Sequence, residues 1–429
     1  MTIYLTRDNL STNSTRVAKI PLIKRREKVL TIKNKTFFLV LTILIALTFL
    51  PNSARAATPK ILTIWTEQAN VSAIKSLSAN WAKDRGITVE VVGKNGFGLG
   101  GDLATIGPAG KGPDIIILGH DSIAGLAITG AISPLSSNIF DPKMVAKSAV
   151  TAVSFNSQIY AVPLTVQNLA LATNLTLAKS SPLTFSEMEE KSRALIVAGK
   201  ATVGLVTDAN GYGVYPIFDA LGGYVFKTSL NGKIDPKVTG IYSAQLAKNA
   251  AVFERFKQEK FMDFSKLWGN TAFFDGKAPY MLVGSWNVPA LSTSPFKYEI
   301  SGIPNLQGRP ARVLTGVQAA IMSNFAKSKL VARDYLKNVV SKSDFSSAIA
   351  KAQNSFPVNL EAAAAQDPNS IGSKFGNVGL SGFPMPNVPQ MQKVWSYWNG
   401  AWENWGNDKG SFSEIFSKAA KDLTLALNS

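Results

Sequence analysis

A short apolar run with turn residues at both ends constrains the fold of this chain most. Ile115–Leu118 contains four consecutive apolar residues, preceded by Gly112-Pro113 and followed by Gly119. Such a run is typical of a strand buried on both faces, as in a parallel sheet covered by helices. Ligands of open α/β sheets bind just beyond the carboxyl ends of the strands. We therefore expect Gly119, His120 and Asp121 to lie at a functional edge.

The rest of the chain alternates between strand-like and helical patterns. Strands are expected at Lys60–Trp65, Ile87–Val92, Ile159–Ala172, Ala201–Val206, Ala278–Val283 and Leu314–Met322. Helices are expected at Ala73–Asp84, Phe185–Ala198, Ala244–Glu259 and Leu330–Val340, and from Glu361. This rhythm predicts an α/β protein with open, mostly parallel sheets and flanking helices. The 429 residues suffice for two or three domains of about 100–200 residues each.

The N-terminal segment has the order of a secretory signal peptide. Residues 1–56 carry ten basic and two acidic residues. The basic cluster precedes the fourteen-residue apolar run Phe37–Leu50, which leads to the small-residue site Ser53–Ala56. The run is shorter than the about 20 residues of a membrane span. Because the basic part is long, either translation starts nearer Lys24 or the segment stays as an anchor. Both alternatives predict an exported protein, in the periplasm or at the outer face of the cytoplasmic membrane.

Charge and cysteine content exclude several classes of protein. The first 56 residues account for +8 of the net charge of +17, and the remaining basic residues are scattered, so we expect no nucleic-acid partner. The chain has no cysteine. That excludes a lipid anchor on an N-terminal cysteine, thiolate chemistry and cysteine-based metal sites. We expect neither a metal nor a cofactor.

A glycine-rich stretch satisfies the dinucleotide-binding pattern G-x-G-x-x-G. Its glycines are Gly96, Gly98 and Gly101, and Asp121 lies twenty residues later. That pattern needs a helix of about three turns immediately after the glycines, to hold the pyrophosphate at its N-terminus. Only Asp102–Ile106 is available before Gly107-Pro108. We interpret the stretch as a surface loop, and a dinucleotide enzyme is the alternative that the motif raises.

His120 and Asp121 could form a general base and its orienting partner. Adjacent side chains point apart, however, and the chain has no G-x-S-x-G nucleophile motif. We expect a structural role for His120 and no catalytic residue. For Asp121 two roles stay open, a cap for the next helix or an acceptor for ligand hydroxyls.

Tryptophans mark a second set of candidates. Trp395, Trp398, Trp402 and Trp405 fall within about 80° of one another on a helix, so we expect the last three in the core. Trp395 begins the helix and is expected at the edge of a cleft. Trp286 follows an apolar strand in the same way as His120 does. Flat aromatic rings suit the C–H faces of sugars, whose hydroxyls take hydrogen bonds.

Several motifs match a known family in order and approximate spacing. They are Leu62–Trp65, Gly112–Ile116 with His120-Asp121, Gly222–Tyr224, Gly284–Trp286, and Met385–Met391 with Trp395. The chain from Lys60 onward thereby resembles the family 1 extracellular solute-binding proteins of ABC transporters, of the maltose-binding type.

The resemblance implies a two-lobed periplasmic-binding-protein fold of type II with a hinge. The lobes would be 57–165 plus 316–360 and 166–315 plus 361–429. A carbohydrate, such as a maltodextrin-like oligosaccharide or α-glucoside, would bind between them and pass to ABC permease subunits, with the protein a monomer. The implied ligand-binding residues are Glu67, Leu118, Gly119, Asp121, Gln167, Asn210, Tyr212, Trp286 and Trp395.

This sequence departs from the family pattern at several of these positions. Gln167 and Asn210 stand where the family has glutamates, Leu118 replaces a tryptophan and Ser122 an arginine. Hydrogen bonds to charged groups contribute about 1.5–3 kcal/mol against about 1 for neutral ones, so the departures should change which hydroxyls are recognised. The alternative class is an exported glycoside-acting enzyme, which would need two carboxylates across the cleft. Only Glu67 and Asp121 lie at strand ends.

Overall fold

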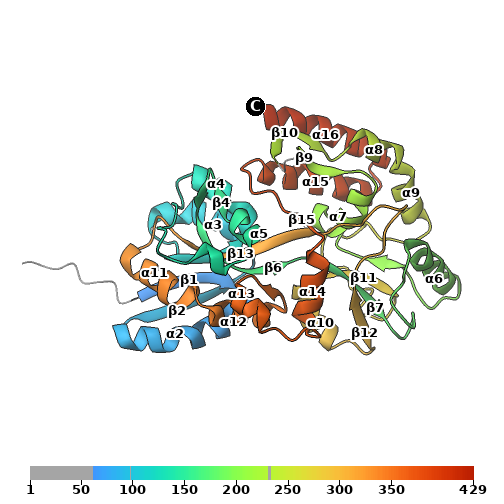
Figure 1. Cartoon of the computed structure of the whole chain (residues 1–429). Coiled ribbons are helices and arrows are strands. Elements are labelled where there is room, and N and C mark those ends of the chain that lie inside the picture. The colour runs from blue at the N-terminus through green and yellow to red at the C-terminus, as the bar shows by residue number, and fades with distance from the viewer. Residues whose placement is uncertain (1–60, 97, 230–232) are drawn as a thin grey trace, which may run out of the picture. The chain divides into compact units, whose positions relative to one another are not determined.

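The computed structural model describes residues 61–96, 98–229 and 233–429. These residues belong to one compact unit, Thr58–Ser429, and the expected signal peptide over 1–56 lies outside the described residues. The unit contains two larger β-sheets, each with helices packed on both faces (Figure 1).

The first sheet has seven strands in the order β14-β6-β13-β3-β1-β2, with β15 beside β13. The strands are β1 (Ile61–Glu67), β2 (Thr88–Lys94), β3 (Ile115–Gly119), β6 (Ala161–Gln167), β13 (Leu314–Met322), β14 (Phe356–Pro357) and β15 (Phe383–Pro384). Strand β1 is parallel to β2 and β3, whereas β6 pairs antiparallel with β13 and β14, so this sheet is mixed rather than mostly parallel as expected. The chain reaches β13 after leaving the second sheet, and β13 runs antiparallel to β3 and β6.

Strand β3 sends alternate side chains to two separate cores. Ile115 and Ile117 pack in one core and Ile116 and Leu118 in the other, which confirms that this strand is buried on both faces. Figure 1 shows the helices of the two layers above and below the sheet. One layer holds α2 (Val71–Arg85), α11 (Lys329–Tyr335), the π-helix Leu336–Val340 and α12 (Ser343–Gln353), with α13 (Leu360–Ala364) beside α12. The other layer holds α3 (Leu99–Ile106), α4 (Ile123–Ile128) and α5 (Lys147–Ala152).

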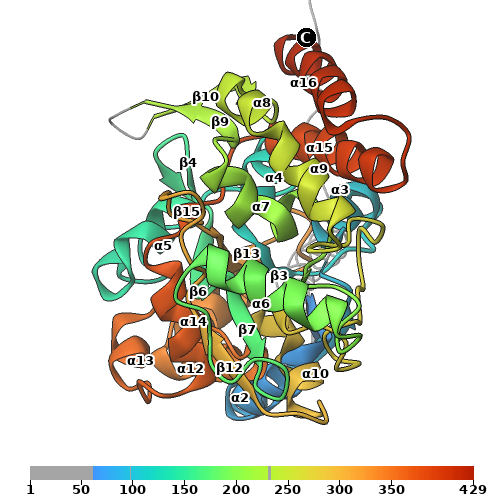
Figure 2. The ribbon, with the colours of Figure 1, turned by 90° about the vertical axis from the view of Figure 1, so that its right-hand side faces the viewer.

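The second sheet has four strands in the order β12-β7-β11-β8. They are β7 (Leu169–Asn174), β8 (Leu205–Val206), β11 (Tyr280–Gly284) and β12 (Tyr298–Ser301). The helices around it are α6 (Phe185–Val197), α7 (Gly211–Ala220), α8 (Ala244–Lys248), α9 (Ala250–Gln258), α10 (Val288–Ser292), α14 (Ile371–Gly379), α15 (Met391–Gly406) and α16 (Phe412–Asn428). Two small hairpins complete the fold, β4 (Ser154–Phe155) with β5 (Gln158–Ile159) and β9 (Tyr224–Thr228) with β10 (Ile234–Gly240). Figure 2 shows β9 and β10 beside α8 and α16.

The chain passes between the two sheets at a buried asparagine. The extended stretch expected over Ile159–Ala172 is two strands, because β6 ends at Gln167 and β7 begins at Leu169. Between them the fully buried Asn168 donates from Nδ2 to the carbonyls of Leu169 and Phe375, at 2.9 and 3.0 Å. The amide thus ties the crossing to α14.

Two expected elements differ in extent. The helix expected over Ala244–Glu259 is interrupted at Asn249, whose side chain donates to the Leu221 carbonyl at 2.9 Å. The glycine-rich stretch is not entirely a loop, because α3 begins at Leu99. Gly98 precedes this helix with φ of 90°, in the left-handed region that glycine adopts readily. At eight residues α3 is still shorter than the three turns of a dinucleotide fold.

The expected tryptophan core is confirmed. Trp398, Trp402 and Trp405 are at most 1% exposed. The ring of Trp402 lies 5.3 Å from that of Phe253 and 4.7 Å from that of Phe416, centroid to centroid, which joins α15 to α9 and α16.

Replacing Trp402 with alanine should lower the free energy of unfolding by about 3–5 kcal/mol, because a large buried ring leaves a cavity that the core cannot close. Urea unfolding followed by far-ultraviolet circular dichroism measures the change. Tyr397→Ala is the matched control, since Tyr397 lies on the same helix and is 37% exposed. Equal losses in the two variants would contradict the assignment of Trp402 to the core.

Candidate functional site

The expected residues Glu67 and Gln167 are brought together by a third residue. Glu67 ends β1 and Gln167 ends β6, and Gln318 of β13 lies between these strand ends. Gln318 Nε2 donates to Glu67 Oε1 at 3.1 Å and to Gln167 Oε1 at 3.0 Å. Sequence analysis missed Gln318, although a lone glutamine in the apolar run Leu314–Met322 was a signal.

The carboxylate of Glu67 is surrounded by amides. Burial raises its pKa, and hydrogen bonds from Gln318 and then Gln353 partly oppose this rise. Gln353 Nε2 lies 3.5 Å from Glu67 Oε2. None of the ion pairs among the described residues includes Glu67.

His120, in the 3₁₀ turn that follows β3, has a structural role. The backbone N–H of Val317 donates to Nδ1 at 2.9 Å. The other nitrogen, Nε2, therefore carries the proton and donates to the Met385 carbonyl, also at 2.9 Å. Burial is the main cause of its lowered pKa, so the ring is neutral at pH 7. With both nitrogens engaged, His120 has no free atom for general-base catalysis.

Asp121 accepts a hydrogen bond from Trp395, whose Nε1 lies 3.3 Å from Oδ2. Asp121 does not cap α4, because the N-cap residue is Ser122, without a side-chain capping bond, and the N–H of Ala124 in the first turn donates to Asn387 instead. Burial raises the pKa of Asp121. Gly119 leaves room for this carboxylate, because a Cβ there would stand 2.9 Å from Asp121 Oδ1.

Three aromatic residues from different elements, Tyr212, Trp286 and Trp395, lie near Asp121 or near one another. Burial, and then the charge of Asp121, raises the pKa of Tyr212, whose hydroxyl donates to the Leu314 carbonyl at 3.3 Å. The ring of Tyr212, at the start of α7, lies 5.9 Å from that of Trp286, at an interplanar angle of 49°. Trp286 follows β11 and is 44% exposed. Trp395 stacks on Trp398 at 5.9 Å.

Two of the expected ligand-binding residues, Leu118 and Asn210, have buried side chains. Leu118 is 3% exposed and packs in the core beneath α3 and α4, so its side chain offers no surface to a ligand. Asn210 is 1% exposed and caps α7. Its Oδ1 accepts from the N–H groups of Tyr212 and Gly213, and its Nδ2 donates to the Leu267 carbonyl. The structure therefore does not support direct ligand contacts for these two side chains.

The segment Met385–Met391 holds Trp395 in place. Its Asn387 accepts from the N–H of Ala124 at 3.0 Å and donates to the carbonyls of Ala152 and Ser154 at 2.9 and 3.1 Å. With the His120 hydrogen bond to Met385, these contacts fix the start of α15 beside the end of β3.

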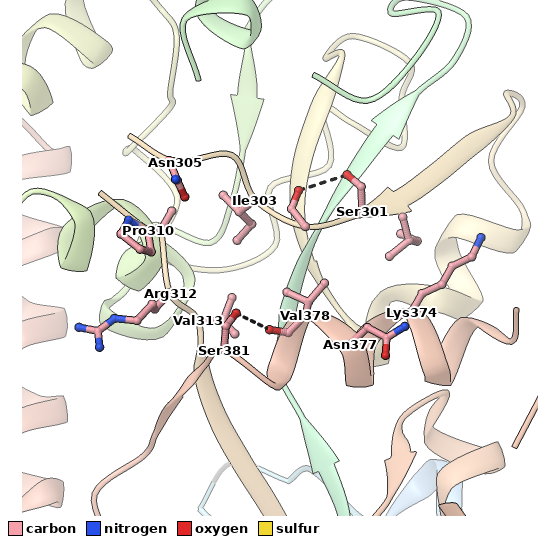
Figure 3. Close-up of a pocket in the computed structure, with 13 residues that line it drawn as sticks. Ser301, Ile303, Asn305, Pro310, Arg312, Val313, Lys374, Asn377, Val378 and Ser381 are labelled. Atoms are coloured by element: carbon pink, nitrogen blue, oxygen red, sulfur yellow. Dashed lines mark hydrogen bonds between the residues drawn. The ribbon is translucent and has the colours of Figure 1, made fainter. Parts of the chain in front are cut away.

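A separate pocket of about 380 Å³ lies between the end of β12, the following loop and α14 (Figure 3). None of the nine expected ligand-binding residues lines it. Its Arg312 is paired with Asp219 at 2.8 Å. Among the described residues no cluster of three or more His, Asp or Glu side chains could hold a metal ion. In the same residues we find no helix long and apolar enough to cross a membrane.

Comparison with known proteins gives consistent matches. The model of the family described as bacterial extracellular solute-binding protein matches residues 76–371. The maltodextrin-binding protein MdxE of Bacillus subtilis (strain 168) is 26% identical over 356 residues, 80% of this chain and 85% of that protein. The galactooligosaccharide-binding protein of the same organism is 23% identical over 383 residues, 84% and 88% of the two chains. The maltotriose-binding protein of Pyrococcus abyssi (strain GE5 / Orsay) is 25% identical over 336 residues, 73% and 70%.

The family match spans more than half of the chain. The family has the two-lobed type II fold, in agreement with the two helix-covered sheets, and its members are binding proteins of transporters rather than enzymes. The chain therefore belongs to the bacterial extracellular solute-binding proteins.

Proposed function

We propose that this protein binds a carbohydrate and delivers it to the permease subunits of an ABC importer. The observation that carries the proposal is the group formed by Asp121, Tyr212, Trp286 and Trp395. Aromatic rings remove the C–H faces of a sugar from water, while a carboxylate accepts hydrogen bonds from its hydroxyls.

The ligand class is proposed from the relatives together with the site. Proteins named for maltodextrin, galactooligosaccharide and maltotriose binding resemble this chain over most of its length. We propose an oligosaccharide or α-glucoside, such as a maltodextrin. Gln167 and the helix cap Asn210 stand where the family pattern has glutamates, so the hydroxyls recognised by this chain would differ.

Capture would occur by closure of the two lobes built on the two sheets. The expected bounds, 57–165 plus 316–360 and 166–315 plus 361–429, would cut β6 after Thr165 and α13 after Leu360, so we propose that the first lobe includes all of both elements. The chain passes from one sheet to the other at Asn168, whose side chain is hydrogen-bonded, and passes back before β13. These two neighbouring crossings support a hinge between the lobes. A sugar that contacts both lobes would stabilise the closed form, which the permease would then recognise. We propose that residues 1–56 direct export to the periplasm or the outer face of the cytoplasmic membrane, and that the protein acts as a monomer.

Thermal-shift screening of the exported part tests the proposal. Maltose, maltotriose, maltohexaose, galactotriose and glucose are suitable probes. A bound ligand at 100 times its Kd stabilises the folded state by about 2.7 kcal/mol, enough for a clear shift in Tm. Turnover of p-nitrophenyl glycosides without any sugar-induced stabilisation would instead favour a glycoside-acting enzyme.

Trp286→Ala and Trp395→Ala should each weaken sugar binding by about 2 kcal/mol or more, because each removes an aromatic anchor. Titration calorimetry with the best sugar of the screen measures the loss. Tyr397→Ala, on the same helix as Trp395, is the control and should bind normally. Unchanged affinity in both tryptophan variants would place the sugar elsewhere.

Sugar affinity should fall on acidification, starting at a higher pH than for an ordinary aspartate. The ionised form of Asp121 accepts the hydroxyls, and its raised pKa means that protonation removes this form earlier as pH decreases. Affinity measured from pH 7 to pH 4 should show the decline, and Asp121→Asn should bind weakly with a flatter profile. An identical pH profile in this variant would exclude Asp121 as the titrating group.

A further inference from the structure

The pocket in Figure 3 lies between two segments that lead into the proposed hinge, and its volume is about 380 Å³. One wall is the segment that runs from the end of β12 toward β13, and it includes Ile303 and Val313. The other wall is α14, which contributes Val378. The pocket therefore joins the loop before β13 to the helix before β15.

Both walls are hydrogen-bonded to segments that cross between the sheets. The Val313 carbonyl, one residue before β13, accepts from the N–H of Phe383 in β15 at 2.7 Å. The Phe375 carbonyl of α14 accepts from Asn168 at 3.0 Å. Gly379 of the same helix lies so close to Asn168 that a Cβ there would stand 2.6 Å from its Oδ1. A molecule held between the two walls would thus contact the supports of both crossings.

The lining of the pocket combines apolar surface with positive charge. Ile303, Val313 and Val378 supply hydrocarbon surface. The charged residues are Arg312 and Lys374, and none of the described residues that line the pocket is acidic. It also contains no aromatic ring on which a sugar could stack. An anion with an apolar body matches this lining better than a sugar does.

The two cations differ in how far their charge is already neutralised. Arg312 donates from Nε and Nη2 to the carboxylate of Asp219, at 2.9 and 2.8 Å, so this pair is close to neutral. Lys374 is exposed and takes part in none of the ion pairs between described residues.

Asn377 completes a set of donors with Lys374. It lies three residues later, on the same face of α14, and Figure 3 shows the two side chains next to each other. An ammonium group and an amide N–H together suit a carboxylate, which only accepts hydrogen bonds when it is ionised.

We propose that this pocket is an effector site for a small organic carboxylate with an apolar body. Lys374 and Asn377 bind the carboxylate, and Ile303, Val313 and Val378 contact the hydrocarbon part.

The effect of such a ligand follows from the conformation in which the pocket is formed. In this conformation Trp395 of α15 donates to Asp121 across the candidate site. A ligand that stabilises this arrangement of the crossings favours the same conformation and strengthens sugar binding. The coupling to sugar rests on the proposed function, whereas binding of the carboxylate does not.

Three probes test the chemistry of the pocket on the protein from Thr58 onward, which forms one compact unit. Hexanoate has both a charge and an apolar body, hexanamide lacks the charge, and inorganic phosphate lacks the apolar body. Ligand-observed NMR titration should show hexanoate binding about threefold or more tightly than hexanamide, because an exposed charge contributes modestly, and no binding of phosphate.

Variants place the binding in this pocket. Lys374→Met should weaken hexanoate binding about threefold or more, whereas Lys374→Arg keeps the charge and should retain it. Ile303→Ser should also weaken binding, because it removes apolar contact. Lys351→Met is the matched control, since Lys351 is an exposed lysine in the last turn of α12 that does not line the pocket. Equal hexanoate affinity in the wild type and Lys374→Met, or equal affinity of the wild type for hexanoate and hexanamide, would overturn the site.

Calorimetry with the best sugar of the thermal-shift screen, with and without saturating hexanoate, tests the effector role. Hexanoate should raise sugar affinity about fivefold, and the sugar should raise hexanoate affinity by the same factor, because linkage is reciprocal. Sugar affinity that is unchanged or lowered by hexanoate would overturn the effector role. If the wild type binds hexanoate but no sugar, the proposed function and the effector role fail while the carboxylate site stands.

Discussion

The neutral ring of His120 is the constraint on which the candidate site depends. One nitrogen accepts from the backbone of β13 and the other donates to Met385, so three segments distant in sequence meet at one buried ring. A backbone N–H can only donate and a carbonyl can only accept, so a single tautomer fits. Asp121 comes directly after this ring, and Trp395 lies in the second turn of α15, which begins at Met391 and not at Trp395 as expected from the sequence. Their contact therefore follows from the position of His120.

Local pattern predicted much of the fold and less of the site. The apolar run Ile115–Leu118 and the tryptophan spacing both depend on burial of neighbouring residues, and both expectations are confirmed. The division of Ile159–Ala172 between two sheets depends on a hydrogen bond from Asn168 to the distant Phe375, which no local pattern contains. The two-lobed fold was predicted from the resemblance to a family and not from local pattern, and the family match supports that prediction.

The site shows why residue type alone is insufficient. Asn210 and Asp121 both follow strands and both carry oxygens. The oxygen of Asn210 is used in capping α7, whereas the Asp121 carboxylate accepts a hydrogen bond from the ring of Trp395. The side chain of Leu118, which the resemblance implies as a ligand contact, packs in the core. Gln318 becomes significant only because strand register sets it between Glu67 and Gln167. Each distinction requires three-dimensional partners.

The polar atoms of Asn210 are already hydrogen-bonded within their own part of the fold. The two sides of the candidate site therefore present different kinds of side chain. Charged and amide acceptors come from the sheet that contains β1, β6 and β13, whereas the rings of Tyr212 and Trp286 come from the segments around the other sheet. Ring stacking discriminates weakly among sugars, and hydrogen bonding discriminates strongly. Substitutions at the ends of β1, β6 and β13 would therefore change the polar partners of the candidate site, while the rings around the other sheet stayed in place.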